Sequence, residues 1–161
     1  MRARLMLLRS GVAYPPSGRG VVVVDGSGGS RAAGIGGWLV TSDGRVESWC
    51  HRTSVANISR VEIAALVYGA HRAMSVDSYV TWSIYSDRAS VAEELVEIER
   101  PGDPVRATID LIVDGRVLVE WIGRESEIMQ SADALARAGR LLPDNPIDPM
   151  RLTSMIRESS G

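Results

Sequence analysis

Four acidic residues of this 161-residue chain fall where the ends of secondary-structure elements are expected: Asp25, Glu62, Asp87 and Asp133. Asp25 follows directly on four valines at 21–24, a run that predicts a strand buried on both faces. A carboxylate in that position costs free energy to bury unless a positive charge neutralises it. Carboxylate oxygens are the ligands that Mg²⁺ and Mn²⁺ prefer, and two such ions activate water for phosphodiester hydrolysis. The four residues therefore indicate metal-dependent cleavage of a phosphodiester.

Each of these residues also has a simpler explanation. An aspartate after a strand commonly starts a turn, and an acidic residue in the first turn of a helix is stabilised by the helix dipole. The helix dipole alone would account for Glu62, Asp87 and Asp133, which we expect at helix starts. Their combination favours a shared site, because strand ends and the helix starts that follow them meet in one crevice of an open sheet.

The remaining pattern predicts the elements that would position the carboxylates. Alternating or β-branched runs predict strands, apolar residues at helical spacing predict helices, and Pro and Gly mark the breaks. Strands are expected over 21–24, 35–40, 45–52, 80–85 and 116–122, and helices over 59–75, 87–100, 104–113 and 129–142. This order predicts an α/β fold: a five-stranded mixed sheet, with three antiparallel strands and then two further strands, covered by helices on both faces. Either Asn57 or Ser59 would cap the first of these helices.

The length of 161 residues fits one domain with flanking segments. We expect an N-terminal extension over 1–19, a catalytic domain over 20–142, and a Pro-rich tail over 143–161 that carries a short helix at 150–158. Residues 5–8 would form either a short edge strand or a segment packed on the surface.

Composition gives weaker indications. The net charge is −2 and all 18 cationic side chains are arginine, so phosphate binding would depend on a local group of arginines. Cys50 is the single cysteine and no apolar run could span a bilayer, which predicts a cytoplasmic protein. We expect a monomer. The four tryptophans are expected in packing positions, with Trp49 the best candidate for stacking on a base.

Several motifs resemble the ribonuclease H superfamily, specifically its type 1 branch, over roughly residues 20–140. Residues 24–29 and 34–38 are similar to the family's opening strand and Gly-rich hairpin. The remaining matches are its Arg-x-Glu-x-x-Ala helix start at 60–66, its third acidic motif at 85–87 and its fourth at 121–125 and 132–136. The resemblance implies the ribonuclease H fold.

The resemblance also implies an activity. It implies two Mg²⁺ ions, which Mn²⁺ can replace, and endonucleolytic hydrolysis of the RNA strand of an RNA/DNA hybrid that leaves a 3′-hydroxyl and a 5′-phosphate. The implied metal ligands are Asp25, Glu62, Asp87 and Asp133. The chain resembles a variant of that family that lacks the active-site loop histidine. Arg124 and Glu125 stand in that loop, and we expect one of them to assist product release.

Substrate contacts are expected around the same crevice, from Gly26, Ser27, Asn57, Ser59, Arg60 and Arg88. The asparagine pair that the family uses before its first helix is absent, so two alternatives stay open. One is a structure-selective DNA nuclease or resolvase on the same fold. The other is a non-catalytic nucleic-acid-binding module, although four mutually repelling carboxylates without a metal would lower stability.

Overall fold

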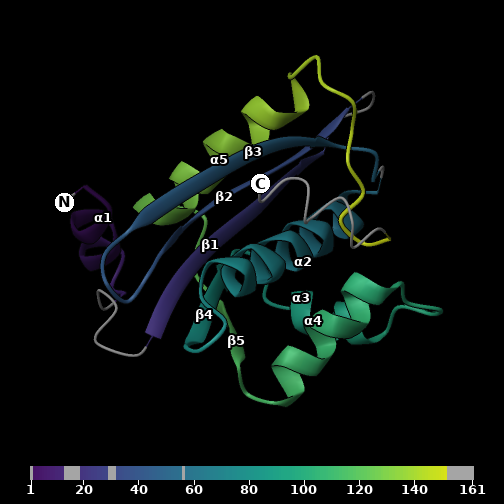
Figure 1. The fold of residues 1–161 in the computed structure, drawn as a ribbon. Coiled ribbons are helices and arrows are strands. Elements are labelled where there is room, and N and C mark those ends of the chain that lie inside the picture. Colours follow the sequence, from purple (N-terminus) through teal and green to yellow (C-terminus); the bar gives the residue numbers. More distant parts are fainter. Residues whose placement is uncertain (1, 13–18, 29–31, 56, 152–161) are drawn as a thin grey trace.

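The computed structural model describes residues 2–12, 19–28, 32–55 and 57–151, and it centres on one five-stranded sheet (Figure 1). The strands are β1 (Arg19–Gly28), β2 (Ala33–Val40), β3 (Val46–Thr53), β4 (Thr81–Ser86) and β5 (Val117–Trp121). Their order is β3-β2-β1-β4-β5. β1 pairs antiparallel with β2 and parallel with β4, so the two halves of the sheet meet at β1. The predicted fold class is confirmed.

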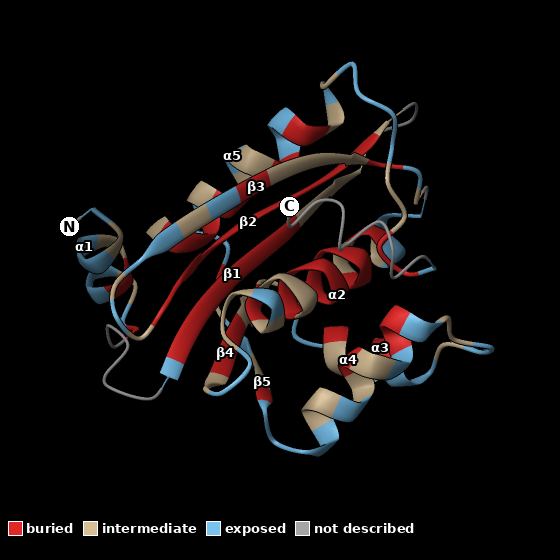
Figure 2. Cartoon of the chain, viewed as in Figure 1, coloured by how far each residue is buried: buried red, intermediate tan, exposed pale blue. Residues whose placement is uncertain are grey.

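Helices cover both faces of the sheet, as Figure 1 shows. They are α1 (Arg2–Arg9), α2 (Ile58–Val76), α3 (Val91–Val96), α4 (Asp103–Val113) and α5 (Glu127–Arg140). Val22 and Val24 of β1 belong to the core beneath α2, α3 and α4, whereas Val21 and Val23 belong to the core beneath α1 and α5. The valine run therefore faces two cores, and Figure 2 shows β1 and β2 buried along most of their length.

Two differences from the predicted element boundaries bear on the candidate carboxylates. β1 does not end at Asp25 but continues to Gly28, because its pairing with β2 extends to Ala33. α3 occupies only Val91–Val96 of the helix expected over 87–100. Residues 87–90 form a turn instead, in which the Arg88 backbone N–H donates to the Ser86 hydroxyl at 3.2 Å.

The helix starts explain two further boundaries. Of the two cap candidates, Asn57 caps α2, since its side-chain oxygen accepts from the Ser59 backbone N–H at 2.9 Å. α5 begins at Glu127, two residues before the predicted start, because the Ser126 hydroxyl accepts from the Met129 backbone N–H at 3.3 Å. Glu62 in α2 and Asp133 in α5 therefore lie further from the helix start than the sequence indicated.

The flanking segments pack against the domain. Residues 5–8 belong to helix α1 rather than to an edge strand, and Leu7 is fully buried beside α5. At the other end, Ile147 forms a parallel bridge with Thr53, and Met150 packs into the core beneath α2. The division into 1–19, 20–142 and 143–161 stays a prediction. The expected terminal helix at 150–158 falls almost entirely outside the described residues.

No helix within the described ranges is both long enough and apolar enough to cross a membrane.

Candidate active site

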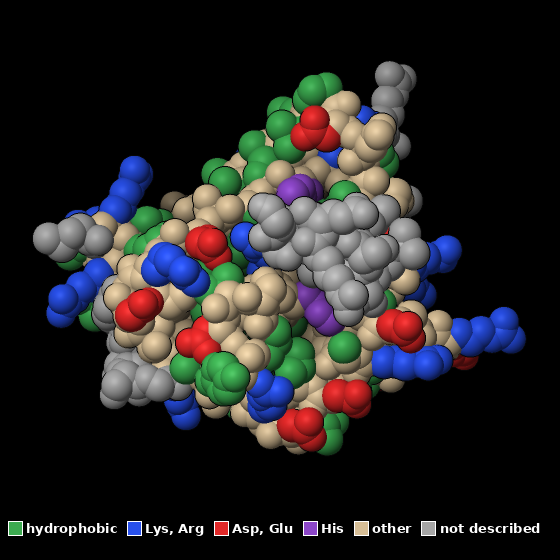
Figure 3. Space-filling view, viewed as in Figure 1, with side chains coloured by type: hydrophobic (Ala, Val, Ile, Leu, Met, Phe, Trp, Pro, Cys, Tyr) green, Lys and Arg blue, Asp and Glu red, His purple; other side chains and the backbone are tan. Residues whose placement is uncertain are grey.

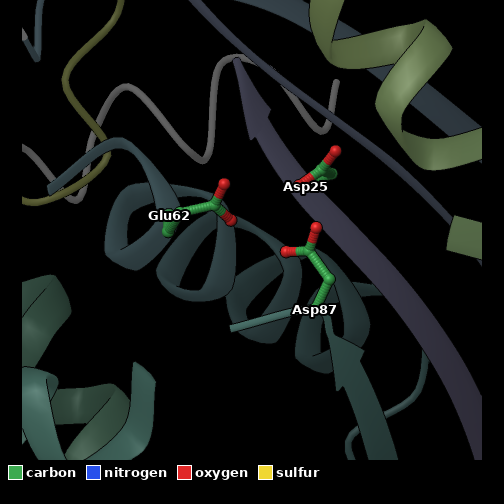
Figure 4. A group of neighbouring side chains, drawn as sticks. All are labelled: Asp25, Glu62 and Asp87. Carbon is green, nitrogen blue, oxygen red and sulfur yellow. The ribbon is translucent and has the colours of Figure 1, made fainter. Parts of the chain in front are cut away.

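Three of the four predicted carboxylates come together from separate elements. Asp25 lies on β1, Glu62 on α2, and Asp87 directly after β4. One carboxylate oxygen from each lies within 4.8 Å of the other two. Figure 4 shows the three side chains pointing toward a common centre.

The parallel pairing of β1 with β4 brings the two aspartates together. Val23 is in register with Tyr85, so two residues further along Asp25 and Asp87 are side by side. β4 has ended by this point while β1 continues. Because β4 ends before the level of Asp25, no strand residue of β4 lies beside Asp25, and the carboxylates meet at this position.

Two glycines let helices approach the sheet closely enough to deliver the other carboxylates. A Cβ on Gly26 would lie 2.7 Å from Val61 Cγ1 and 2.9 Å from the Val61 carbonyl oxygen, so α2 packs directly on β1 immediately before Glu62. A Cβ on Gly36 would collide with the Ala136 backbone N of α5. Gly36 pairs with Asp25, and this close approach brings Asp133 to the same end of the sheet.

Burial raises the pKa values of all three clustered carboxyls, and the charges of neighbouring carboxylates raise them further. Burial, with the charges of Glu62 and Asp87, raises the pKa of Asp25 to about 9. Burial, followed by the charge of Asp87, raises the pKa of Glu62 to about 8. Burial also raises the pKa of Asp87, which Arg124 partly offsets. Without a cation, the cluster therefore retains protons at neutral pH.

The donor set fits a divalent metal. All the converging groups are carboxylate oxygens, and Glu62 Oε2 is buried without a hydrogen-bond partner. An unpartnered buried carboxylate oxygen is costly unless a cation or a proton satisfies it. These ligands belong to the class that Mg²⁺ and Mn²⁺ prefer.

Asp133 lies next to this cluster and not within it. Its carboxyl shares a hydrogen bond with Asp25 that raises the pKa of Asp25, and it also forms an ion pair with Arg137 at 3.0 Å. The helix dipole explains neither Asp133 nor Glu62, because each lies beyond the first turn of its helix, where the dipole has little effect.

The loop after β5 reaches the cluster through Arg124. Its guanidinium lies 3.9 Å from an Asp87 carboxylate oxygen, although 84% of the side chain is exposed. Glu125 is exposed, and its carboxylate folds back over Gly123. Both predicted turnover residues are thus in the loop beside the site, with Arg124 the one that contacts it.

The predicted substrate residues are close to the site, but several are engaged locally. Arg88 pairs with Glu94 through two contacts of 2.6 Å and donates to the Ser59 hydroxyl at 3.0 Å. The Asn57 side chain caps α2, and Arg60 is exposed beside a groove of about 470 Å³ that glutamates of and after α3 also line. Gly26 and Ser27 continue β1 past Asp25.

The tryptophans depart from the prediction in two cases. Trp49, the expected base-stacking candidate, is buried, with its ring 5.6 Å from that of Tyr68. Trp121, expected in packing, is 61% exposed. It is the last residue of an edge strand and is followed within two residues by Gly123, which is the sequence signal that could have indicated its exposure.

Similarity to known proteins is found in the structure and not in the sequence. The sequence matches no protein-family model and no curated protein. Among solved structures, the N-terminal RNase H domain of a Mycobacterium tuberculosis protein is 21% identical, with a TM-score of 0.59 over 76% of this chain and 98% of that one. RNase H1 from the archaeon Halobacterium salinarum is also 21% identical, with a TM-score of 0.56 over 76% and 97%.

The chain has the ribonuclease H fold. A third structure with this fold, LC11-RNase H1 in complex with an RNA/DNA hybrid, is 14% identical, with a TM-score of 0.53 over 75% of this chain and 96% of that one. Two of these three neighbours are RNase H1 proteins, so the predicted resemblance to the type 1 branch is confirmed at the level of the ribonuclease H fold.

Proposed function

We propose that this protein is a divalent-metal-dependent endonuclease that hydrolyses the RNA strand of RNA/DNA hybrids. The observation that carries the proposal is the buried convergence of Asp25, Glu62 and Asp87, in which Glu62 Oε2 has no partner. The neighbour bound to an RNA/DNA hybrid supports this choice of substrate.

The proposed roles follow the positions of the side chains. Asp25 and Asp87 are the central metal ligands, Glu62 contacts one metal and the scissile region, and Asp133 binds the second metal from α5. When bound, Mg²⁺ or Mn²⁺ supplies an activated water and stabilises the charge on the leaving oxygen. The products are a 5′-phosphate and a 3′-hydroxyl.

Product release is assigned to the loop after β5. Arg124 already contacts Asp87, so its guanidinium can accompany a departing phosphate from the carboxylates to solvent. Glu125 is the second candidate for this step, as a neighbouring exposed carboxylate.

Hybrid recognition is proposed to depend on the wide, shallow minor groove and the 2′-hydroxyls rather than on base sequence. The contacting residues are Gly26, Ser27, Asn57, Ser59, Arg60 and Arg88. Figure 3 shows arginines scattered singly on the face in view, with acidic residues between them. On the face in view, local contacts rather than a broad basic surface would hold the nucleic acid.

The test is a cleavage assay with Mg²⁺ and with Mn²⁺ on four labelled substrates: an RNA/DNA hybrid, duplex RNA, duplex DNA and a four-way DNA junction. Asp87→Asn removes a cluster carboxylate, whereas Asp110→Asn makes the same change at an exposed position of α4. We expect metal-dependent cutting of the hybrid's RNA strand with 5′-phosphate ends, lost in Asp87→Asn and retained in Asp110→Asn.

Other outcomes would redirect the proposal. Cutting of the junction alone would keep the metal site and assign the protein to structure-selective DNA cleavage. No cutting of any substrate, together with no change of melting temperature on adding Mg²⁺, would contradict an enzyme and favour a non-catalytic binding module.

We further propose that the protein acts as a monomer in the cytoplasm. The single cysteine, Cys50, supports a reducing compartment. Light scattering during size-exclusion chromatography would detect a dimer if one forms.

A further inference from the structure

Trp121 differs from the other three tryptophans of the chain. Its side chain is 61% exposed, whereas Trp38, Trp49 and Trp82 are 4%, 6% and 0% exposed. Burying an indole is strongly favourable, so a largely exposed tryptophan indicates a surface that contacts a partner.

The backbone of Trp121 is fixed beside the acidic cluster. Trp121 is in register with Ser86, and the next residue, Ile122, donates its backbone N–H to the Ser86 carbonyl at 3.0 Å. Ser86 directly precedes Asp87. Because neighbouring strands lie about 4.8 Å apart, Trp121 is two strands, or about 10 Å, from the backbone of Asp25.

The direction of the side chain follows from the alternation along β5. Val117 and Val119 face the core beneath α2, α3 and α4, and Trp121 continues the same strand face. At Trp121, however, the helices no longer cover that face. Arg124, three residues on, is also exposed and contacts Asp87. Arg124 thus flanks Asp87 from the loop, and the indole lies at the same strand end on the sheet face covered by α2, the helix that carries Glu62.

We propose that Trp121 contacts a nucleotide of the bound substrate through the face of its indole, and so extends the substrate-binding surface from the acidic cluster across the end of β5. This inference rests on the proposed nuclease function. The ligand chemistry is the flat, largely apolar face of a nucleotide. An unpaired base offers such a face for stacking, and a ribose at the minor groove of an intact hybrid offers a smaller one.

The experiment uses the full chain with Asp87→Asn to prevent cleavage, in the presence of Mg²⁺. Because the other three tryptophans are buried, acrylamide quenching of tryptophan emission reports mainly on Trp121. We expect a hybrid with a single-stranded overhang to protect the emission from acrylamide, and a blunt hybrid to protect it less.

Matched substitutions separate contact from general surface effects. In the same background, Trp121→Ala should weaken binding of the overhang hybrid by at least about 5-fold, and Trp121→Phe should retain most of the affinity. Tyr79→Ala is the control, because Tyr79 is 97% exposed but precedes β4, at the opposite end of the parallel strands. It should bind both hybrids as tightly as the parent.

The affected substrate identifies the contact. An effect confined to the overhang hybrid assigns the contact to an unpaired base, and an equal effect on the blunt hybrid assigns it to a ribose. Hybrid binding that is unchanged in Trp121→Ala, with no protection from acrylamide, would overturn the inference while the nuclease proposal stands. Failure of the unsubstituted protein to bind or cut any nucleic acid would instead overturn the proposed function, and the inference with it.

Discussion

The carboxylates and the arginines of the candidate site are held in different ways. Asp25 is 3% exposed, and its position is set by β1, by the end of β4 and by helices that touch the sheet at glycines. Arg88 and Arg124 are on turns and are held by ion pairs with Glu94 and Asp87. The carboxylates are therefore positioned by the core, and the arginines by local ion pairs, which under the proposed function a substrate phosphate would replace.

The difference separates two kinds of functional group. Carboxylates that repel one another need a rigid frame to remain together, because each raised pKa reflects an unfavourable interaction that the fold must offset. Arginines that receive a substrate need no such frame, since exposed ion pairs contribute only about 0–1 kcal/mol and exchange readily. Four predictions test this contrast.

The largest effect is expected from Asp25→Asn. The substitution removes a ligand charge from the centre of the cluster while preserving the size of the side chain. We expect hybrid cleavage with Mg²⁺ to fall by about 100- to 1,000-fold or more, as for the loss of several kcal/mol of charge stabilisation. Single-turnover rates measure the effect. A rate within 10-fold of that of the unsubstituted protein corresponds to a change of roughly 1.4 kcal/mol or less in activation free energy. That outcome would contradict the role of Asp25 as a central ligand.

The next effect is expected from Gly36→Val, which tests the frame itself. The new side chain would force α5 away from β2, and overpacking of this kind costs about 1–3 kcal/mol. We expect a lower free energy of unfolding in urea together with reduced cleavage, because Asp133 moves with α5. Gly115→Val is a contrasting variant, because its turn has open space but a φ of +73°. It should lose stability without losing catalytic rate.

A smaller effect is expected from pH on the metal-free protein. In the folded state the pKa of Asp25 is about 9, against an ordinary value of 3.8, so the folded protein holds a proton that the unfolded chain has released. The contribution of Asp25 to stability is therefore greatest below about pH 4, falls as pH rises toward 9, and levels off above it. Glu62 acts in the same direction between 4.5 and about 8.

Thermal melting with and without Mg²⁺ measures this dependence. Mg²⁺ should raise the melting temperature more at pH 8.5 than at pH 5, by about 2–4 °C for each kcal/mol of net stabilisation. Asp25→Asn should flatten the metal-free profile. A Mg²⁺ effect that is equal at both pH values would argue against protons and metal competing for the same carboxylates.

The smallest effect is expected at the arginines. Glu94→Gln would release Arg88 from its ion pair at little cost in stability, since both side chains are partly exposed. We expect hybrid affinity to rise about 2- to 5-fold at low salt and less at high salt. Glu97→Gln makes the same charge change in the same groove without an Arg88 contact, so equal gains in both variants would assign the effect to net charge alone.

The contrast also explains what the sequence could predict. Asp25 and Asp87 were found because each directly follows a run of strand residues, and the ends of strands meet in one crevice of an open sheet. The parallel pairing of β1 with β4 is what the structure adds. The positions of Glu62 and Asp133 along their helices were misjudged, since the caps at Asn57 and Ser126 start both helices earlier than apolar spacing suggests. Asp133 was nevertheless assigned to the same site, first from its expected place at a helix start and then from the resemblance to a known family.

The arginine contacts could not be predicted because they depend on local geometry. The turn at 87–90 shortens α3 and aims Arg88 at Glu94, and apolar periodicity carries no information on such a turn. The exposure of Trp121 depends on where helix cover ends over β5, which is a tertiary property. The buried strands and the aspartates at their ends could be predicted from the pattern of apolar residues. The arginine contacts and the exposure of Trp121 depend on tertiary packing, which that pattern does not describe.

The bridge between Thr53 and Ile147 has a consequence for the outer edge of the sheet at β3. The last residues of β3 would otherwise present free backbone groups at a sheet edge, but Ile147 donates to the Arg52 carbonyl at 2.9 Å and accepts from Ser54 at 3.1 Å. An uncovered edge strand can template pairing with another molecule. We therefore expect a chain truncated before Ile147 to aggregate during expression, while the geometry of its carboxylate cluster is unchanged.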